Sequence, residues 1–285
     1  MIGNNPILNK ELRLRMRSKR SPLAIALYLL VLGSIVFSFI FLEMGNSQYF
    51  NPDHSKTLFI TLSILQFTLI SFVTPGLTAG LISGERERQT LPMLLTTNLS
   101  ATAIIIGKWL SSLSFILFLI VTTLPLYGIV LLYGGISPIE MLKIFAMYLV
   151  SMFAIGSFGL MFSTLFKRSG VATVVTYGVI ISYTFFTFLA GGILTNVLWH
   201  SRQNTIAAGQ SFPIWPDLLF SINPLAAILY VFGEGPLADR YHGAPSSLPF
   251  DAYWIFLLFF ALLTVIALVL AIYFLKPVKP RLFRR

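Results

Sequence analysis

The chain has 285 residues, of which 56 % are hydrophobic and only 11 % are charged. About a quarter of the residues of a soluble globular domain are charged, so this composition excludes a soluble enzyme and a disordered segment. The sequence contains no Cys, which excludes disulfide bonds, thiolate metal sites and Cys nucleophiles. Several apolar runs are long enough to cross the ~30 Å hydrocarbon core of a bilayer. The composition is therefore that of a polytopic membrane protein.

Residues 1–22 precede the first long apolar run and are predicted to form an amphipathic helix. Leu8, Leu12 and Arg15 recur at roughly helical intervals within a strongly basic stretch. Such a helix is expected to lie along the inner membrane surface, with its basic side chains toward anionic lipid headgroups. The apolar run that follows is too long for the core of a signal peptide, so we predict that it is a retained span.

Six apolar segments are predicted to span the membrane, and together they make up a transmembrane domain at residues 23–275. Helices are expected because backbone polar groups must be satisfied within lipid, and the sequence lacks the alternating pattern of a membrane β-barrel. Pro75 interrupts the second segment, and Pro125 is able to kink the third. The predicted fold class is therefore an all-α polytopic membrane protein. The six segments cover residues 23–42, 58–82, 103–133, 141–166, 171–199 and 253–275.

The formal net charge of +10 arises mainly from basic residues that flank the predicted spans. Six of them lie between Lys10 and Arg20, and five more lie in the tail at residues 276–285. The predicted inner loops add Arg86, Arg88, Lys108, Lys167 and Arg168, whereas the predicted outer segments hold Lys56, Lys143, Arg202 and Arg240. Basic residues next to spans stay on the cytoplasmic side, so we expect both termini in the cytoplasm. This placement favours a multi-pass protein of the plasma membrane, in contact with lipid and not with nucleic acid.

The predicted outer region at residues 200–252 contains one apolar stretch that is too short to cross the membrane. Residues 218–232 are mostly apolar, but they number only about 15, and Asn223-Pro224 breaks them. A seventh span here would also place the basic tail on the outer side. We therefore expect a re-entrant or interfacial helical segment within this region.

The sequence contains none of the common motifs for nucleotide binding or hydrolytic catalysis. The phosphate-binding motif G-x-x-x-x-G-K-[ST] is absent, as are H-E-x-x-H and G-x-S-x-G. His54, His200 and His242 fall in predicted outer loops, far apart in the sequence, as solvated histidines do. No catalytic residue, metal ligand or cofactor is therefore predicted in this chain. No ionisable residue lies near the middle of a predicted span, which argues against proton coupling.

Hydroxyl-bearing residues recur at helical spacing along one face of the second and of the fifth predicted span. Such faces can pack against other helices, as the small residues Gly156, Gly159 and Ser163 suggest for the fourth span. Alternatively, they can line a mildly polar pathway or a seam between subunits. The residues concerned are Thr61, Thr68, Ser71 and Thr78 in the second span and Thr176, Tyr183 and Thr187 in the fifth.

The first predicted inner loop, at residues 83–102, combines alternating charges with an apolar patch. Pro92 disfavours helix at the preceding residue, so a short new helix is predicted to begin at Pro92. The apolar side chains after it are expected to project from the membrane. The loop then either rests at the interface or serves as a docking knob for a soluble partner. The residues singled out are Glu85, Arg86, Glu87, Arg88, Leu91, Met93, Leu94 and Leu95.

This loop closely resembles the corresponding loop of ABC exporter permeases of the type-2 family. The resemblance lies in the run Ser83-Gly84-Glu85-Arg86-Glu87-Arg88-Gln89-Thr90-Leu91, followed by Leu94-Leu95-Thr96-Thr97 and Gly107-Lys108. The opening at residues 5–12, the six-span plan and the Asn223-Pro224 segment are also similar, so the resemblance covers essentially the whole chain. Two residues depart from the pattern: Gln89, where such loops often have Gly, and Pro92.

The resemblance implies a type-V-like ABC exporter, in which two permease subunits, identical or homologous, each pair with a separate ATPase subunit. ATP and Mg would then bind to the ATPase and not to this chain. Residues 85–97 would form the coupling helix, residues 7–20 a surface connecting helix, and the second and fifth spans the central seam. The residues alone leave two other classes open: an ATP-independent secondary carrier or channel, and a non-transporting membrane anchor of a complex.

Overall fold

The computed structural model describes residues 20–46, 52–96, 100–132, 134–203, 214–237, 248 and 250–275. Six helical stretches in this part of the chain are long and apolar enough to cross a membrane, which confirms the predicted all-α architecture with six spans. They are Ile25–Leu42, Ser55–Glu87, Ala101–Leu132, Pro138–Leu165, Ser169–Leu198 and Ala252–Leu275. The predicted amphipathic helix at residues 1–22 lies almost entirely outside the described residues, and the tail at residues 276–285 lies wholly outside them.

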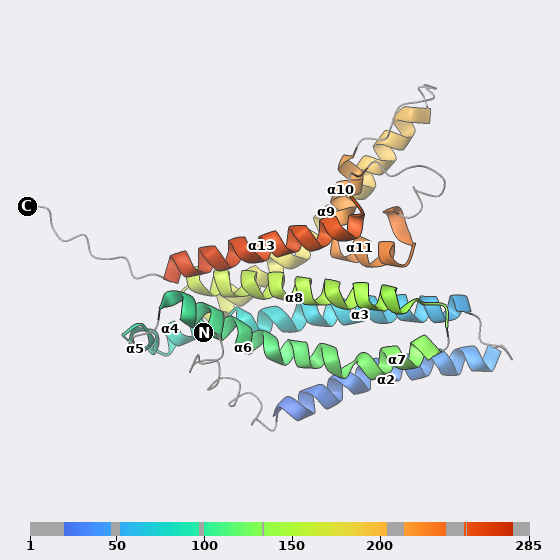
Figure 1. The fold of residues 1–285 in the computed structure, drawn as a ribbon. Coiled ribbons are helices and arrows are strands. Elements are labelled where there is room, and N and C mark those ends of the chain that lie inside the picture. The colour runs from blue at the N-terminus through green and yellow to red at the C-terminus, as the bar shows by residue number, and fades with distance from the viewer. Residues whose placement is uncertain are drawn as a thin grey trace, which may run out of the picture.

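The spans form a bundle from which the second half of α9 slants away, and the two ends of the bundle carry different short helices (Figure 1). Helices α4 and α5 lie together at one end, where α3 ends and α6 begins, whereas α10 and α11 lie toward the opposite end. The helices are α2 (Arg20–Asn46), α3 (Pro52–Thr78), α4 (Ser83–Glu87), α5 (Leu91–Leu95), α6 (Ala101–Thr122), α7 (Leu124–Leu132), α8 (Pro138–Leu165), α9 (Ser169–Gln203), α10 (Trp215–Ile222), α11 (Pro224–Val231) and α13 (Ala252–Leu275).

The two prolines within predicted spans have different effects on the helices. The third span is divided, because α6 ends at Thr122 and α7 begins at Leu124. Pro125 thus falls in the first turn of a new helix, where its missing N–H removes no hydrogen bond. The prediction for Pro75 was wrong, since α3 continues through this residue and ends at Thr78. Membrane helices tolerate proline where neighbouring helices cover the freed backbone, and Pro75 is buried.

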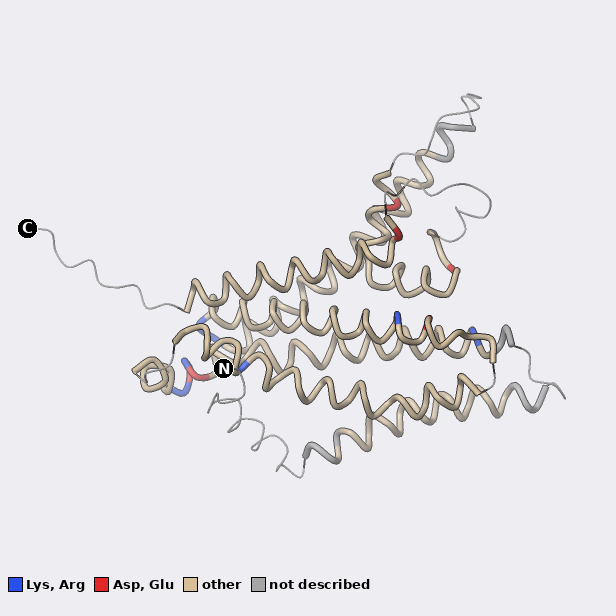
Figure 2. Tube along the Cα trace, viewed as in Figure 1, with Lys and Arg blue, Asp and Glu red and all other residues tan. Residues whose placement is uncertain are grey.

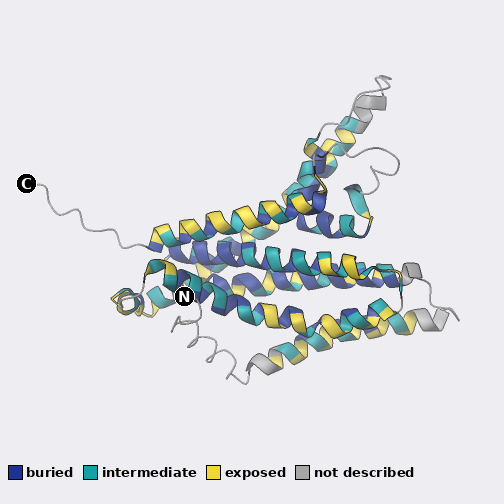
Figure 3. Ribbon diagram, viewed as in Figure 1, coloured by how far each residue is buried: buried dark blue, intermediate teal, exposed yellow. Residues whose placement is uncertain are grey.

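Helix α8 is the most buried of the six spans. In its spanning window 67 % of the residues are buried, against 6 % in that of α9, and Figure 3 shows α8 dark blue along much of its length. Small residues allow its close contact with α3, because a Cβ built on Gly159 would overlap Oγ1 of Thr78. Another Cβ, built on Gly156, would lie 2.7 Å from a methyl carbon of Leu113. The predicted packing role of these glycines is therefore confirmed.

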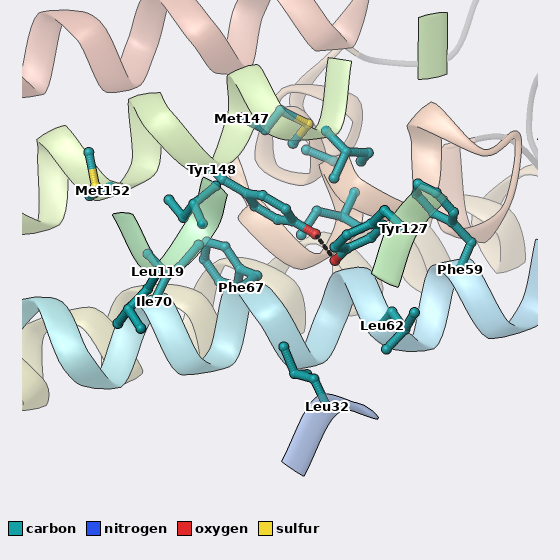
Figure 4. Packing of buried hydrophobic residues seen from close by; sticks show 14 of the residues in the cluster. Leu32, Phe59, Leu62, Phe67, Ile70, Leu119, Tyr127, Met147, Tyr148 and Met152 are labelled. Carbon is teal, nitrogen blue, oxygen red and sulfur yellow. Dashed lines mark hydrogen bonds between the residues drawn. The ribbon is translucent and has the colours of Figure 1, made fainter. Parts of the chain in front are cut away.

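The largest core cluster contains tyrosine hydroxyl groups among its apolar side chains (Figure 4). Tyr127 of α7 and Tyr148 of α8 share a hydrogen bond of 3.1 Å, and Tyr148 also bonds to the backbone O of Ser63 at 3.1 Å. The fully buried Gln66 of α3 accepts a hydrogen bond of 2.5 Å from Tyr28 of α2. Polar groups need such partners within a bilayer, so these bonds join α2, α3, α7 and α8.

The short apolar segment predicted at residues 218–232 forms parts of two short helices, α10 and α11, which meet at Asn223. Each has eight residues and is therefore about 12 Å long, too short for a ~30 Å hydrocarbon core. Oδ1 of Asn223 accepts hydrogen bonds from the backbone N–H groups of Leu225 and Ala226 and so caps α11. Its Nδ2 donates to the backbone O of Thr184 and to Oγ1 of Thr187, both on α9, at 2.7 Å. The predicted break at Asn223-Pro224 thus forms an elbow that is fixed to α9.

Candidate functional site

The loop at residues 83–96 forms two single-turn helices, α4 and α5, with a tight turn between them. The backbone N–H of Thr90 donates to Glu85 O, and that of Gln89 donates to Arg86 O, which is the pattern of a Schellman motif. This motif places a left-handed residue after the helix, and Gln89 has a φ of 59°. A residue with a Cβ is strained there, so the turn accounts for the Gly that similar loops often carry. α5 begins at Leu91, one residue before the predicted start.

Glu85 and Lys108 form an ion pair between α4 and α6. Nζ of Lys108 and Oε1 of Glu85 lie 2.9 Å apart, and the Lys108 side chain is only 6 % exposed. The hydroxyl of Thr90 donates a further hydrogen bond to Glu85. Burying an ammonium group costs free energy unless the group is paired. The carboxylate of Glu85 therefore balances the charge of Lys108 within this chain. The sequence placed Lys108 in the inner loop, but it lies in the second turn of α6.

Arg86 binds the C-terminal end of α8. Its Nη1 donates to the backbone O of Phe166 at 3.3 Å, and its Nη2 donates to the backbone O of Thr164 at 3.2 Å. The last carbonyl groups of a helix lack partners within the helix and carry the negative end of its dipole. The guanidinium group of Arg86 donates hydrogen bonds to these carbonyl groups and places a positive charge at the negative end of the dipole. It thereby joins α4 to the end of α8.

Glu87 binds the N-terminal end of α9. Its Oε1 accepts a hydrogen bond of 2.8 Å from the backbone N–H of Ser169, and its Oε2 accepts one of 2.7 Å from the hydroxyl of the same residue. The first N–H groups of a helix have no partner within it and favour negative charge nearby. Because Ser169 is the first residue of α9, the Glu87 carboxylate acts as an external cap for that helix.

A serine of α8 holds the backbone that leads into α4. Oγ of Ser163 accepts hydrogen bonds from the N–H groups of Ile82 and Ser83 at 2.8 and 2.9 Å, and it lies 3.1 Å from Oγ of Ser83. Together with the three charged residues, this contact joins α4 to α6, α8 and α9. We call these residues the loop bracket: Ser83, Glu85, Arg86, Glu87, Lys108, Ser163 and Ser169.

Further residues of the loop are exposed on its surface. Met93 is 75 % exposed, whereas Leu91 is buried in a second core cluster with Ile104 and Leu160. Leu94 and Leu95, which were expected to project, are half-buried against that cluster. The charged residues of the loop lie at the end of the bundle (Figure 2). Glu87 and Thr90 are also exposed, but their side chains bind Ser169 and Glu85. We call the other exposed residues of this surface the loop face: Arg88, Gln89, Pro92, Met93 and Thr96.

The hydroxyl-bearing residues on one face of α3 differ in exposure along the helix. Thr61 and Thr68 are exposed, and each donates its hydroxyl hydrogen bond to the backbone of its own helix four residues earlier, at 2.9 and 2.8 Å. Ser71 is half-buried, and Thr78 is buried against α8. The exposed part of this face is available to a pathway or a seam, and the buried part is used in helix packing.

The hydroxyl face of α9 makes contacts within the chain. Thr176 is buried and donates to the backbone O of Ala172 at 2.6 Å. Tyr183 donates to the backbone O of Ile222 at 2.6 Å, and Thr187 accepts the hydrogen bond from Asn223. Tyr183 and Thr187 therefore fix the α10–α11 elbow to α9, whereas Thr176 bonds within its own helix. The opposite face of α9 carries exposed apolar side chains such as Val174, Ile181 and Phe185.

Sequence reasoning did not identify Lys108, Ser163, Ser169 and Gln66 as partners in these contacts. For two of them, Lys108 and Ser169, the local sequence does predict the kind of partner that the side chain or backbone requires. A single Lys within the apolar run at residues 101–122 requires an acidic partner, and the nearest acidic residues in the sequence are in the loop. A Ser that directly precedes an apolar run marks a helix start, where a carboxylate is favourable.

Comparison with known protein families gives a match over nearly the whole chain. The model of a family described as "ABC-2 family transporter protein" matches residues 5–279. Comparison with curated proteins gives no match. The family match covers all six spans, the loop at residues 83–96 and the α10–α11 elbow.

Proposed function

Because the chain belongs to the ABC-2 transporter family, as a multi-pass permease, we propose that it forms the substrate pathway of an exporter driven by separate ATPase subunits. The ATPase would dock on the loop face and bind ATP and Mg, for which this chain carries no phosphate-binding motif. The loop, and with it both termini, would then lie on the cytoplasmic side of the plasma membrane. The observation that carries the proposal is a fixed loop with an exposed apolar tip.

The loop face has the properties of a docking surface. Met93 presents a flexible apolar side chain, 75 % exposed, between the charged Arg88 and the polar Thr96. The backbone beneath it is held by Leu91, which is buried, and by the Schellman turn at Gln89. A partner that covers Met93 therefore gains an apolar contact without having to order the loop.

The loop bracket supplies a mechanical path from the docking surface to the spans. When the ATPase subunits close, they would displace α4, and its hydrogen bonds would carry the displacement to α6, α8 and α9. α9 has the smallest buried share of the spans, 6 % in its spanning window, so its movement would displace few buried side chains. Glu85 and Glu87 would thus transmit the movement, and the residues of the loop face would make the direct contact with the partner.

A second permease subunit, identical or homologous, would complete the pathway. The apolar side chains on the open face of α9, such as Ile181 and Phe185, support a seam with another subunit or with lipid. The exposed Thr61 and Thr68 of α3 would add a mildly polar strip to the pathway. The α10–α11 elbow would lie in the outer region at residues 200–252, and residues 7–20 would lie on the inner membrane surface.

Substitution of Met93 tests this function. We expect Met93→Asp to insert into the membrane normally but to lose the co-purifying ATPase subunit and ATP-dependent export, because a carboxylate replaces the apolar tip. The matched control is Ile139→Asp, which alters an exposed apolar residue of the first turn of α8 at the opposite end of the bundle. Retention of the ATPase by Met93→Asp, or export by a lone oligomer without ATP, would refute the proposal.

A further inference from the structure

A cavity of about 190 Å³ lies among α3, α8, α9, α11 and α13. We call it the midspan cavity. Half-buried and buried apolar side chains form it, and one residue of its lining, Val179, is 40 % exposed. Other lining residues are Ala154, Phe158, Tyr183, Phe259 and Leu263.

The helix positions of the lining residues place this cavity halfway across the bilayer. Phe67 precedes the end of α3 by eleven residues, and Ala154 precedes the end of α8 by eleven. At 1.5 Å per residue each lies about 16 Å from the end of the bundle that carries α4 and α5. Leu263 lies twelve residues, or about 18 Å, from the same end of α13. These depths agree, and they match the middle of a ~30 Å hydrocarbon core.

The surface of the midspan cavity is entirely apolar, although polar residues contribute to it. The hydroxyl of Tyr183 is turned toward the backbone O of Ile222, to which it donates a hydrogen bond of 2.6 Å. The backbone O of Thr184 accepts a hydrogen bond of 2.7 Å from Asn223. The α10–α11 elbow therefore provides hydrogen-bond partners for the Tyr183 hydroxyl and the Thr184 carbonyl group, and only carbon atoms line the cavity.

We propose that the midspan cavity binds an acyl chain of a membrane lipid. Water is a poor occupant, because a buried water needs two or more polar partners and the lining offers none. An apolar cavity of about 150 Å³ is known to bind a benzene-sized molecule, so the midspan cavity has room for a segment of a hydrocarbon chain. At this depth the surroundings of the bundle are hydrocarbon, and Val179 is exposed to them.

An acyl chain in this position would pack between α9 and α13. Tyr183 and Phe259 are stacked, with ring centroids 6.4 Å apart, and both rings line the cavity. Because few side chains of α9 are buried, an occupant that touches α8, α9 and α13 at once supplies contacts that the protein itself lacks. The inference rests on this geometry and holds independently of the ATPase proposal.

Photo-crosslinking with a lipid probe tests the site. The full chain is reconstituted into phosphatidylcholine vesicles that contain phosphatidylcholine with a diazirine on the acyl chain, and the labelled residues are mapped by mass spectrometry. We expect labels within residues 154–158, 179–184 and 259–263. A probe with the diazirine on the headgroup should leave these residues unlabelled. Labels confined to other parts of the chain would overturn the proposal.

Two variants and one control make the test specific. Ala154→Leu fills the cavity and Val179→Phe obstructs its exposed edge, so each should lower acyl labelling there by about tenfold. Val179→Phe changes a partly exposed residue and should fold even where Ala154→Leu does not. Ala146→Leu, on the same helix but outside the lining, should label as the native chain does. Unchanged labelling in both cavity variants, or crosslinks to a second copy of the chain in place of lipid, would overturn the proposal.

The same probe distinguishes a resident lipid from a transported one. With the ATPase partner present, ATP turnover would leave the labelling of a resident lipid unchanged and would lower that of a transported lipid. Both results support an acyl-chain site, and neither depends on the loop face. Failure of Met93→Asp to release the ATPase would therefore leave this inference intact.

Discussion

The carboxylate of Glu87 accepts hydrogen bonds from both the backbone N–H and the hydroxyl of Ser169, at 2.8 and 2.7 Å. The two residues are 82 positions apart, and their contact joins α4 to the first turn of α9. No other span in the described part of the chain has so small a buried share as α9. The loop is therefore tied to a span of which few side chains are buried within the chain.

Glu87→Gln should weaken coupling without weakening partner binding. The amide retains an acceptor oxygen but loses the charge that favours a helix N-terminus, so the contact with Ser169 becomes weaker. We expect the ratio of export to ATP hydrolysis to fall in vesicles while the amount of co-purified ATPase stays unchanged. Glu140→Gln removes a similar carboxylate from the first turn of α8 and serves as the control. Loss of the ATPase from Glu87→Gln would instead assign this residue to the docking surface.

Lys108→Met should destabilise the loop end of the bundle. The substitution leaves Glu85, which is 30 % exposed, without its cationic partner at 2.9 Å. We expect a loss of about 1–3 kcal/mol in the free energy of unfolding, measured by thermal unfolding in detergent. The double variant with Glu85→Gln should regain part of it.

Lys56→Met provides the control for this ion pair. Lys56 pairs with Glu234 at 2.8 Å, but the two side chains are 31 % and 51 % exposed. An exposed pair contributes about 0–1 kcal/mol, so the change in melting temperature should be small. Equal effects of Lys56→Met and Lys108→Met would show that burial does not distinguish the two pairs.

Gln89→Gly should stabilise the turn between α4 and α5. Gln89 has a φ of 59°, where a Cβ is unfavourable, and glycine removes this strain. We expect a gain of up to about 1 kcal/mol and slower cleavage of the loop by a protease. Arg88→Gly, at a φ of −80°, should give no such gain, because its native conformation suits any residue. Destabilisation by Gln89→Gly would contradict the role assigned to the left-handed conformation.

Gly159→Ala should disturb the contact between α3 and α8. The added Cβ would overlap Oγ1 of Thr78, so one helix must shift. Overpacking of this kind costs about 1–3 kcal/mol, which thermal unfolding in detergent would detect. Gly178→Ala meets no atom within 4 Å and should be neutral or slightly stabilising. Similar melting temperatures for both variants would argue against close packing at Gly159.

Local features of the sequence determined the number of spans and where several helices break. Apolar length gives six spans because the thickness of the hydrocarbon core sets the length of a membrane helix. Pro92, Pro125 and Asn223-Pro224 mark helix starts, since proline restricts its own backbone and that of the preceding residue. Pro75 gives the same local signal, but α3 continues through it without a break, because the surrounding helices cover it.

Only the tertiary structure decided which charged residues of the loop bind to other parts of the chain. The charged residues at 85–88 alternate in sign, yet Glu85, Arg86 and Glu87 each bind a different span. Their partners are between 23 and 82 positions away, and no spacing rule connects residues so far apart. The packing of α3, α6, α8 and α9 brings these groups together, because buried charges and helix ends each require a partner of opposite polarity.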